Sequence, residues 1–414
     1  MQHVAEITAK PEFKDLHAKL LRAERRSRVR AFLLVLPLLC FLLLAFAVPI
    51  TWILVNSLYN PGIYDGMPNF YSALQADQTN VPGEAVFQAL ADDMAAGRKA
   101  GGLPRALKPL RHQDRRVWRL FSKTSKKIPE IFDGSAKEWF LSYKPDWGKP
   151  KTWTIARRVA KPFTPFYFIH ALDLHHKVTG DLVFKDKDER VYLGVLINTF
   201  EISFFVTLFT FLLGYPLAYW IANMENWKAN ILMVCVLLPF WTSFLVRTYV
   251  WILILQSEGP LNSSMLAIGL IENPLSLIHN RFSVYVAMTH VLLPFMVLPI
   301  YSVMKSIPQE HVKAAVSLGA HPLYAFRRIY FPQTLHGVGA GGFLVFIVAL
   351  GYYITPALVG GAKDTMISMI IADNINVLLN WGMAGALGVI LLVATLTIYF
   401  LYARIMGLED LRIN

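Results

Sequence analysis

Apolar residues gather into long, uninterrupted runs along this chain, and polar segments separate the runs. A transmembrane helix needs about 20 apolar residues to cross the roughly 30 Å hydrocarbon core of a bilayer. Runs of sufficient length occur at 31–55, 193–223, 230–256, 283–304, 337–358 and 381–403. The pattern therefore predicts an all-α polytopic membrane protein with six transmembrane helices.

The first run, 31–55, contains no charged residue. It is too long for the core of a signal peptide, and no small-residue cleavage site follows it. We expect it to be retained as a membrane span. The segment before it, 1–30, ends in a cluster of basic residues, which are Arg22, Arg25, Arg26, Arg28 and Arg30.

Lysine and arginine near the ends of spans mark the cytoplasmic side. The basic segment 1–30 is therefore predicted to be cytoplasmic, and six crossings place the C-terminus on the same side. The two short outer loops agree, because Arg281 is the single basic residue in one and Lys363 in the other. This orientation predicts a cytoplasmic loop at 305–336 and a transmembrane core at 191–414.

A polar insert, 56–190, separates the first two spans and is predicted to face the periplasm. Within it, the four-residue spacing of Val86, Leu90 and Met94 predicts a helix that stops at Gly101. The segment 117–131 alternates apolar and basic residues. It is typical either of an amphipathic helix on the membrane surface or of a helix that packs inside the insert.

Composition supports a membrane protein, since 55% of the residues are hydrophobic and only 16% are charged, against about 25% charged in soluble proteins. The net charge of +12 comes from loops that flank the apolar runs. Anionic lipid head groups account for such a charge, so no nucleic-acid partner is expected. Cys40 and Cys235 lie inside apolar runs and are interpreted as packing residues rather than as a disulfide or zinc site.

The loop 306–337 carries helical patterning that a simple connector does not need. One short helix is predicted to stop near Gly319, and a second to run over 322–329 and close before Pro332. Two short helices that meet at a glycine form a compact knob, which could dock in a groove of a partner. An amphipathic connector on the lipid surface is the alternative.

This loop resembles the Glu-Ala-Ala loop of binding-protein-dependent ABC importer permeases, and its spacing matches at each step. The matching positions are Lys313, Ala314, Ala315, Gly319, Ile329 and Pro332. Lysine stands at 313 where that family has glutamate, and Phe331 stands where it has leucine. The resemblance implies that the loop couples the chain to a nucleotide-binding subunit.

The first span and the region from 193 onward are similar to the spermidine/putrescine branch of that family, specifically its B-type permease subunit. The similar segments include LLGYPLAYWIAN, LLPFWTSFLVRTYVWILIL, LLPFMVLPIYSVM and GYYITPALVGGAKD. The resemblance implies the type I ABC importer permease fold in the bacterial inner membrane and import of polyamines by alternating access. Branches of the family that carry opines, phosphonates or ferric iron share many of these sequence motifs. Opines and phosphonates therefore stay open as substrates.

The resemblance also implies partners: a second permease of C type in a heterodimer, two ATPase subunits that bind ATP and Mg, and a periplasmic binding protein. The chain contains no Gly-x-x-x-x-Gly-Lys-Ser/Thr phosphate loop, so it is expected to hold no cofactor and not to be an enzyme. Rival classes are an ion-coupled secondary transporter, which would carry inverted repeats, and a polytopic membrane enzyme, which would need a catalytic cluster.

Three ionisable residues lie inside the predicted spans, namely Glu201, Arg247 and His290. At a rise of 1.5 Å per residue they share a depth of roughly 10 to 14 Å below the outer surface. One hypothesis is that Glu201 receives a cationic amine while Tyr249 or Tyr353 offers a cation–π face. The alternative is a Glu201–Arg247 ion pair that fixes two helices, and His290 is interpreted as a packing residue.

Prolines interrupt the predicted spans and are expected to kink them, either to gate a path or to shape packing. They are Pro216, Pro239, Pro294, Pro299 and Pro356. The glycines at 337, 339, 341 and 342 predict close helix packing at a partner interface. His170, His175 and His176 cluster in the insert, but no carboxylate or cysteine pattern accompanies them, so no metal site is expected.

Overall fold

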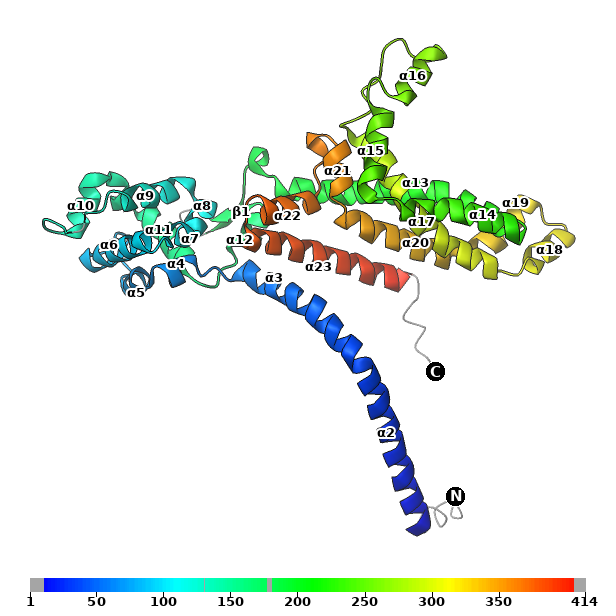
Figure 1. The fold of residues 1–414 in the computed structure, drawn as a ribbon, viewed down its shortest axis with the longest axis horizontal. Helices are drawn as coiled ribbons and strands as arrows, with labels where there is room; N and C mark the ends of the chain where they lie inside the picture. Colours follow the sequence, from blue (N-terminus) through cyan, green and yellow to red (C-terminus); the bar gives the residue numbers. More distant parts are fainter. Residues whose placement is uncertain (1–10, 130, 177–180, 406–414) are drawn as a thin grey trace. The chain divides into compact units, whose positions relative to one another are not determined.

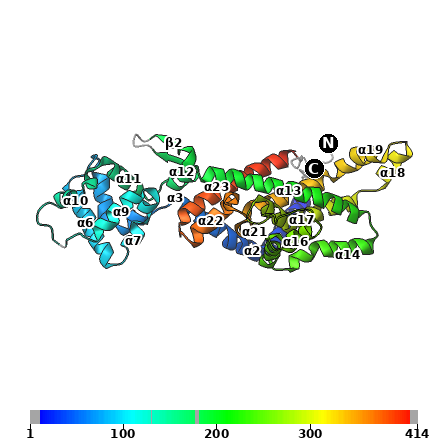
Figure 2. The same ribbon diagram turned by 90° about the horizontal axis from the view of Figure 1, so that it is seen from above.

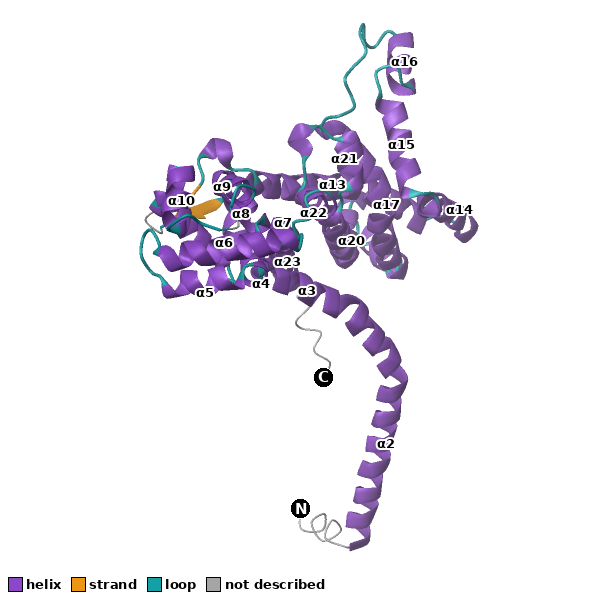
Figure 3. Ribbon diagram, turned by 60° about the vertical axis from the view of Figure 1, so that its left-hand side comes forward, coloured by secondary structure: helices purple, strands orange, loops and turns teal. Residues whose placement is uncertain are grey.

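The computed structural model describes residues 11–129, 131–176 and 181–405 (Figure 1). The chain divides into two compact units, 1–56 and 57–414. Helices make up nearly all of the regular structure, and a single short hairpin supplies the strands of the described residues (Figure 3). The all-α class predicted from the apolar runs is confirmed.

The first unit is one long helical segment. It consists of α2 (Pro11–Leu42), a π-helical turn (Leu43–Ala47) and α3 (Val48–Leu58), which ends just beyond the unit. The stretch Ala23–Leu58 is long and apolar enough to cross a membrane, with a mean hydropathy of 3.0. None of its most apolar window is buried within the chain, so lipid or another polypeptide must cover these side chains.

The second unit begins with a set of short helices and a hairpin. They are α4 (Gly62–Gly66), α5 (Pro68–Ala76), α6 (Glu84–Lys99), α7 (Leu103–Ala106), α8 (Lys108–Gln113), α9 (Arg115–Ser125), α10 (Ala136–Tyr143), α11 (Pro150–Ala160), α12 (Phe166–Ala171), β1 (Leu174–His176) and β2 (Leu182–Phe184). Aromatic side chains fill the core shared by α4 to α11, whereas Tyr167 and Ala171 of α12 pack in a separate cluster with α23. Phe87 meets Trp153 at 4.9 Å between ring centroids, and Phe121 meets Trp147 at 4.7 Å.

The helix predicted after residue 83 is α6, and Val86, Leu90 and Met94 are buried as the spacing indicated. The helix ends before Gly101, whose φ of 71° lies in the left-handed region that favours glycine. The segment 117–131 contributes α9, in which Val117 and Phe121 are buried in the same core. Packing inside the insert is therefore the interpretation that the structure confirms.

The hairpin joins the insert to the next helix, α13 (Tyr192–Ala222). The carboxylate of Asp173 is fully buried just before β1. It accepts a hydrogen bond from the backbone N–H of Leu193 at 2.8 Å and lies 3.4 Å from Lys185 Nζ. Asp173 thus satisfies a free N–H in the first turn of α13 and holds the hairpin against it.

The remaining helices form the apolar core that follows α13. They are α14 (Asn226–Leu237), α15 (Phe244–Leu255), α16 (Pro260–Ala267), α17 (Arg281–Ser306), α18 (Glu310–Ser317), α19 (Pro322–Ala325), α20 (Phe331–Gly351), α21 (Ile354–Val359), α22 (Ile367–Asn376) and α23 (Trp381–Ile405). The long helices α13, α17 and α20 pack against one another around buried Ile202, Met296 and Val345.

Close packing of α17 and α20 depends on glycine. A Cβ added at Gly337 would lie 3.0 Å from the carbonyl oxygen of Pro299, and one at Gly341 would lie 3.0 Å from that of Met296. The sequence predicted that these glycines, together with Gly339 and Gly342, serve a partner interface. For Gly337 and Gly341 that prediction is wrong, because both are buried against α17 of the same chain.

Among the described residues, five helices are long and apolar enough to cross a membrane, and six if one bent pair counts as a span. The bent pair is the predicted third span, which is broken by 98° between Asn226–Trp241 and Phe244–Ala267. A single span over 230–256 with a kink at Pro239 was predicted; the structure shows the interruption, but as a full break between two helices. The break follows Pro239, which sits in a tight 3₁₀ turn, Leu238–Trp241, and cannot donate a helical hydrogen bond.

The fifth span differs from its predicted bounds at both ends. Helical structure is continuous over Pro322–Gly351, through a π-helical turn at Phe326–Tyr330. The predicted stop before Pro332 is wrong, because the π-helical turn leads directly into α20, whose second residue is Pro332. At the other end the helix stops at Gly351, and Pro356 belongs to the separate helix α21.

Within the second unit, the insert and the cytoplasmic-loop candidate occupy opposite ends. Figure 2 shows the insert helices beyond the start of α13, and α18 and α19 beyond its far end. The contacts agree with this placement, since α12 packs on α23 near Gly382, while the side chain of Gln309 lies 3.4 Å from that of Asn223 at the end of α13. A bundle of membrane spans thus separates the two features.

Candidate functional site

The principal polar cluster of the apolar core is built around Arg281, the first residue of α17. Its Nη1 donates to Glu201 Oε1 of α13 at 2.6 Å, and its Nε donates to Asp364 Oδ1 at 3.0 Å. Asp364 is buried in the 3₁₀ turn Ala362–Asp364, whereas the Glu201 side chain is 43% exposed. One guanidinium fork therefore ties α13, α17 and this turn together.

Asn198 extends the same cluster. Its Oδ1 accepts from Arg281 Nη2, and its Nδ2 donates to the carbonyl oxygens of Lys363 at 3.1 Å and Thr365 at 2.9 Å. The backbone after α21 is thereby attached to α13. Two carboxylates face one guanidinium here, so the cluster carries a net charge of −1 in its ionised form.

The cluster corrects one sequence-based alternative. Glu201 was expected to pair with Arg247 if its role is structural, and the structure pairs it with Arg281 instead. Arg281 had been noted only as an isolated basic residue in an outer loop. Its position directly after the helix-capping Asn280 was the signal that could have placed it at the top of a span, within reach of neighbouring carboxylates.

Arg247 lies on α15, immediately after the break in the third span. Its guanidinium carbon lies 5.7 Å from the centre of the Phe244 ring. Its Nε and Nη1 atoms are buried and have no hydrogen-bond acceptor among the described residues. The expected layer of Glu201, Arg247 and His290 is therefore not one connected cluster.

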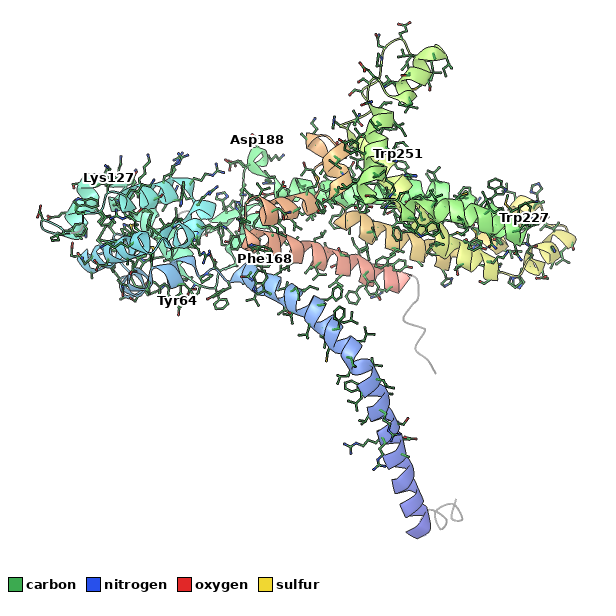
Figure 4. The ribbon with its side chains drawn as sticks, in the orientation of Figure 1. Tyr64, Lys127, Phe168, Asp188, Trp227 and Trp251 are labelled. Carbon is green, nitrogen blue, oxygen red and sulfur yellow. The ribbon has the colours of Figure 1, made fainter. Side chains whose placement is uncertain are left out.

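His290 and its neighbours form a second contact, between α15, α17 and α21. The indole N–H of Trp251, labelled in Figure 4, donates to His290 Nδ1 at 3.2 Å. The hydroxyls of Thr248 and Thr355 lie 3.1 Å apart. These bonds satisfy polar groups between packed helices, as expected for a histidine with a packing role.

Tyr249 and Tyr353 do not share a contact with Glu201 in the structure. Tyr249 is 59% exposed on α15, and Tyr353, which precedes α21, is 43% exposed. Both rings are accessible on this chain, while the Glu201 carboxylate is held by Arg281. The ring and carboxylate components of the amine hypothesis therefore lie in separate clusters.

The candidate coupling surface is the turn between α18 and α19. Gly319 has a φ of 89°, which a residue with a side chain rarely adopts. Apolar side chains crowd this turn and remain in the open, with Leu318 89%, Leu323 69% and Tyr324 61% exposed. Lys313 and Ala314 are also exposed, on α18, while Ile329 is half-buried and Pro332 is exposed at the start of α20.

Aromatic packing fixes this turn to the span bundle. Phe326 and Tyr330 pack on Tyr219 of α13 with centroids 5.5 Å apart in each case. The Tyr215 hydroxyl lies 3.2 Å from Thr334 Oγ1 of α20. These ring contacts hold the base of the turn on α13.

The histidines of the insert are separated by their environments. His170 stacks on Phe166 at 5.7 Å, and burial, aided by nearby Lys185, lowers the pKa of its imidazole to about 4 although Asp173 acts in the opposite direction. His175 is exposed in β1, and the side chain of His176 lies outside the described residues. Within the described part of the chain, no group of three potential metal ligands occurs.

Residues 211–413 match the family model for binding-protein-dependent transport system inner membrane components. The chain is 31% identical over 214 residues to the spermidine/putrescine transport system permease protein PotB of Haemophilus influenzae, covering 52% of this chain and 75% of that protein. PotB of Escherichia coli is also 31% identical, with 52% and 78% covered.

More distant proteins are similar as well. A putative 2-aminoethylphosphonate transport system permease protein of Salmonella choleraesuis is 24% identical, with 52% of this chain and 76% of that protein covered. A solved bacterial alginate ABC transporter, in complex with its alginate-bound periplasmic protein, gives a TM-score of 0.47 at 18% identity. That comparison covers 71% of this chain and 96% of the solved chain.

Proposed function

The chain belongs to the family of ABC importer permeases, the binding-protein-dependent inner membrane components, and from this premise we propose that it is one permease half of an ATP-driven polyamine importer. As a transport subunit it is not itself an enzyme. Support for polyamines comes from the relatives named for spermidine and putrescine transport, which are 31% identical, against 24% for the phosphonate relative.

The proposed assembly has four further subunits and a membrane setting. A second permease of C type completes a path through the inner membrane, and two ATPases supply the energy from ATP and Mg. A periplasmic binding protein delivers the solute, and alternating access moves it inward. Both termini of this chain would be cytoplasmic, and the insert would face the periplasm, which agrees with the opposite placement of the insert and the α18–α19 turn.

The observation that carries the coupling role is the exposed apolar turn around Gly319. An apolar tip such as Leu318, 89% exposed, is unfavourable in water and is stabilised once a partner groove covers it. The alternative, a connector on the lipid surface, would lay these side chains along the membrane. A tip that projects beyond the end of α13 favours a protein groove instead (Figure 2).

Coupling is tested by ATPase activity of the complete complex in liposomes, with the loaded binding protein present. Leu318→Glu should abolish stimulation by the binding protein, because a carboxylate would have to be buried in the groove. Leu270→Glu is the matched control, since Leu270 is also exposed, at 69%, but precedes α17 on the other side. Equal activity of both variants would refute a docking role for the turn.

The same assay tests the substrate. The binding protein is loaded with spermidine, with putrescine, or with nothing, and a polyamine should stimulate hydrolysis. Stimulation by 2-aminoethylphosphonate or an opine, but not by polyamines, would leave the importer in place and transfer the assignment to that solute. Uptake that depends on an ion gradient without ATP would instead favour a secondary transporter.

Glu201 is proposed to attract the amine rather than to enclose it. Its carboxylate is engaged by Arg281 but still 43% exposed, within a cluster of net charge −1. The exposed rings of Tyr249 and Tyr353 would offer cation–π faces farther along the path. If Glu201→Gln lowers the amount of assembled complex without changing uptake affinity, Glu201 has only the structural role.

A further inference from the structure

Arg247 is a cation inside a membrane span, and no carboxylate among the described residues forms an ion pair with it. Its Nε and Nη1 atoms are buried, and no described residue accepts a hydrogen bond from them. The centre of the Phe244 ring lies 5.7 Å from its guanidinium carbon. Ionisable residues within spans normally pair or face water, so this arrangement is incomplete in the isolated chain.

Two carboxylates of the span core, Glu201 and Asp364, are already engaged. Glu201 and Asp364 both accept hydrogen bonds from Arg281. If either left Arg281 to reach Arg247, the Arg281 guanidinium would lose its own partner. An anion supplied by another subunit would complete the arrangement and leave the Arg281 cluster intact.

The backbone beside Arg247 also requires a covering group, for a separate reason. Thr242 and Ser243 lie between the two halves of the broken span and are not helical. The break is level with the middle of α17, because Phe240 packs on Phe295 at 5.0 Å. Non-helical backbone at this depth is tolerated only where protein or a water-filled cavity covers it, and lipid does not suffice.

The exposed apolar side of α15 is the surface that a partner would contact. One side of the helix faces α17 and α21 through Trp251 and Thr248. The other side carries exposed apolar residues next to Arg247, and these are Leu245, Val246, Tyr249, Val250 and Leu253, between 45% and 59% exposed. The break, the unpaired cation and this apolar face adjoin one another on a single short segment.

We propose that the segment 240–253 is the contact surface for the second permease subunit, and that a carboxylate from a span of that subunit binds Arg247. This inference rests on the proposed function, since a polycationic substrate would be repelled by the guanidinium and cannot be its anion. An ion pair between the subunits, beside the broken helix, would also fix the position of one permease relative to the other.

The contact is tested first without perturbing Arg247. A photoreactive benzophenone amino acid at Val246 should crosslink to the second permease when the complete complex is irradiated in membranes. The same group at Val393 of α23, 57% exposed, shows the background level of crosslinking to that subunit. Equal crosslinking from both positions, or lipid adducts alone from Val246, would overturn the proposed surface.

The ion pair is tested by charge reversal. Arg247→Glu should reduce co-purification of the second permease at least tenfold, whereas Lys228→Glu, which reverses an exposed charge in the first turn of α14, should not. A single acid-to-arginine change in a span of the second permease should restore the complex. The proposal fails if the Arg247→Glu variant co-purifies normally with the second permease. If that variant also loses stimulation by the loaded binding protein, Arg247 is a substrate contact instead.

These outcomes are separable from those of the polyamine assignment. Co-purification and crosslinking need no substrate, so they can support the contact even if polyamines fail to stimulate hydrolysis. Conversely, stimulation by a polyamine together with lipid-only crosslinking from Val246 would retain the importer and remove the contact surface.

Discussion

At the scale of single residues, the polar groups of the core fall into satisfied and unsatisfied sets. Arg281 uses its planar fork on two carboxylates and an amide, a geometry that a lysine ammonium cannot reproduce. Trp251 and His290 satisfy one another. Arg247 is the exception among these residues, because its buried Nε and Nη1 have no hydrogen-bond acceptor among the described residues.

We predict that Arg281→Gln lowers the free energy of unfolding by about 2 kcal/mol, since hydrogen bonds to charged groups are lost and Asp364 stays buried without its cation. Arg281→Lys should recover only part of this. Thermal unfolding of the purified complex measures the loss. Lys228→Gln, which removes an exposed pair, serves as the control and should cost about 0.5 kcal/mol or less; a comparable effect of both would contradict the prediction.

His170 gives a pH dependence with a definite sign. Its pKa is lowered to about 4 in the folded chain from an ordinary value of 6.5, chiefly by burial. Between these values the unfolded chain binds the proton and the folded chain does not, so stability should rise with pH across this window. The contribution is complete above pH 6.5 and is lost as the pH falls toward 4.

Unfolding followed by scanning fluorimetry at pH 4.5 and 7 tests this. His170→Gln should flatten the difference between the two pH values, because glutamine does not titrate. His175→Gln is the matched control, as His175 is exposed in β1, and it should leave the difference unchanged. An unchanged difference in the His170→Gln variant would assign the pH effect to other groups.

At the scale of elements, the core depends on helices that approach closely and on one helix that is broken. Glycines of α20 let its backbone reach within van der Waals distance of α17. Pro239 ends α14 in a 3₁₀ turn and redirects the chain into α15. Tight packing fixes the bundle, while the broken span presents a face that the bundle does not cover.

We expect Gly341→Leu to separate α17 from α20, since even a Cβ at this position would lie 3.0 Å from the Met296 carbonyl oxygen. Overpacking of this kind typically costs about 1–3 kcal/mol, so the complex should unfold at lower temperature and transport should fall. Gly388→Leu is the control, because nothing lies within 4 Å of its added Cβ. If the two variants unfold alike, the close approach does not stabilise the bundle.

At the scale of the whole molecule, the second unit carries the insert helices at one end of its spans and the apolar turn at the other (Figure 2). The insert has its own aromatic core and is attached to the bundle through the Asp173 hairpin and through Tyr167, which packs on Gly382 of α23. In the proposed importer, solute would arrive at the end that carries the insert, and the ATPase would bind at the end that carries the turn.

This arrangement predicts opposite accessibility of two engineered cysteines. In a background with Cys40→Ala and Cys235→Ala, an impermeant maleimide should label Asp133→Cys in intact cells. It should label Leu318→Cys only after the membrane is permeabilised. Both positions are exposed, so burial does not limit the reaction. Labelling of both sites in intact cells would contradict the proposed topology.

The sequence by itself determined the class of this protein, because crossing a bilayer requires long apolar runs and these are visible without any tertiary contact. It also determined α6 and the glycine turn after α18, where local spacing and a left-handed backbone suffice. The coupling-loop and substrate-path roles of the matched residues stay predictions that the proposed assays test.

Only the tertiary structure decided which polar groups meet. Glu201 and Arg247 lie at similar predicted depths, but depth does not fix the rotation of a helix, and Arg281 from the end of α17 takes the carboxylate. The glycines of α20 were predicted at a partner interface and instead pack on α17, and the kink predicted at Pro239 is a full break. A one-dimensional pattern gives the faces that a helix can bury, whereas the neighbours on each face follow from how the helices pack.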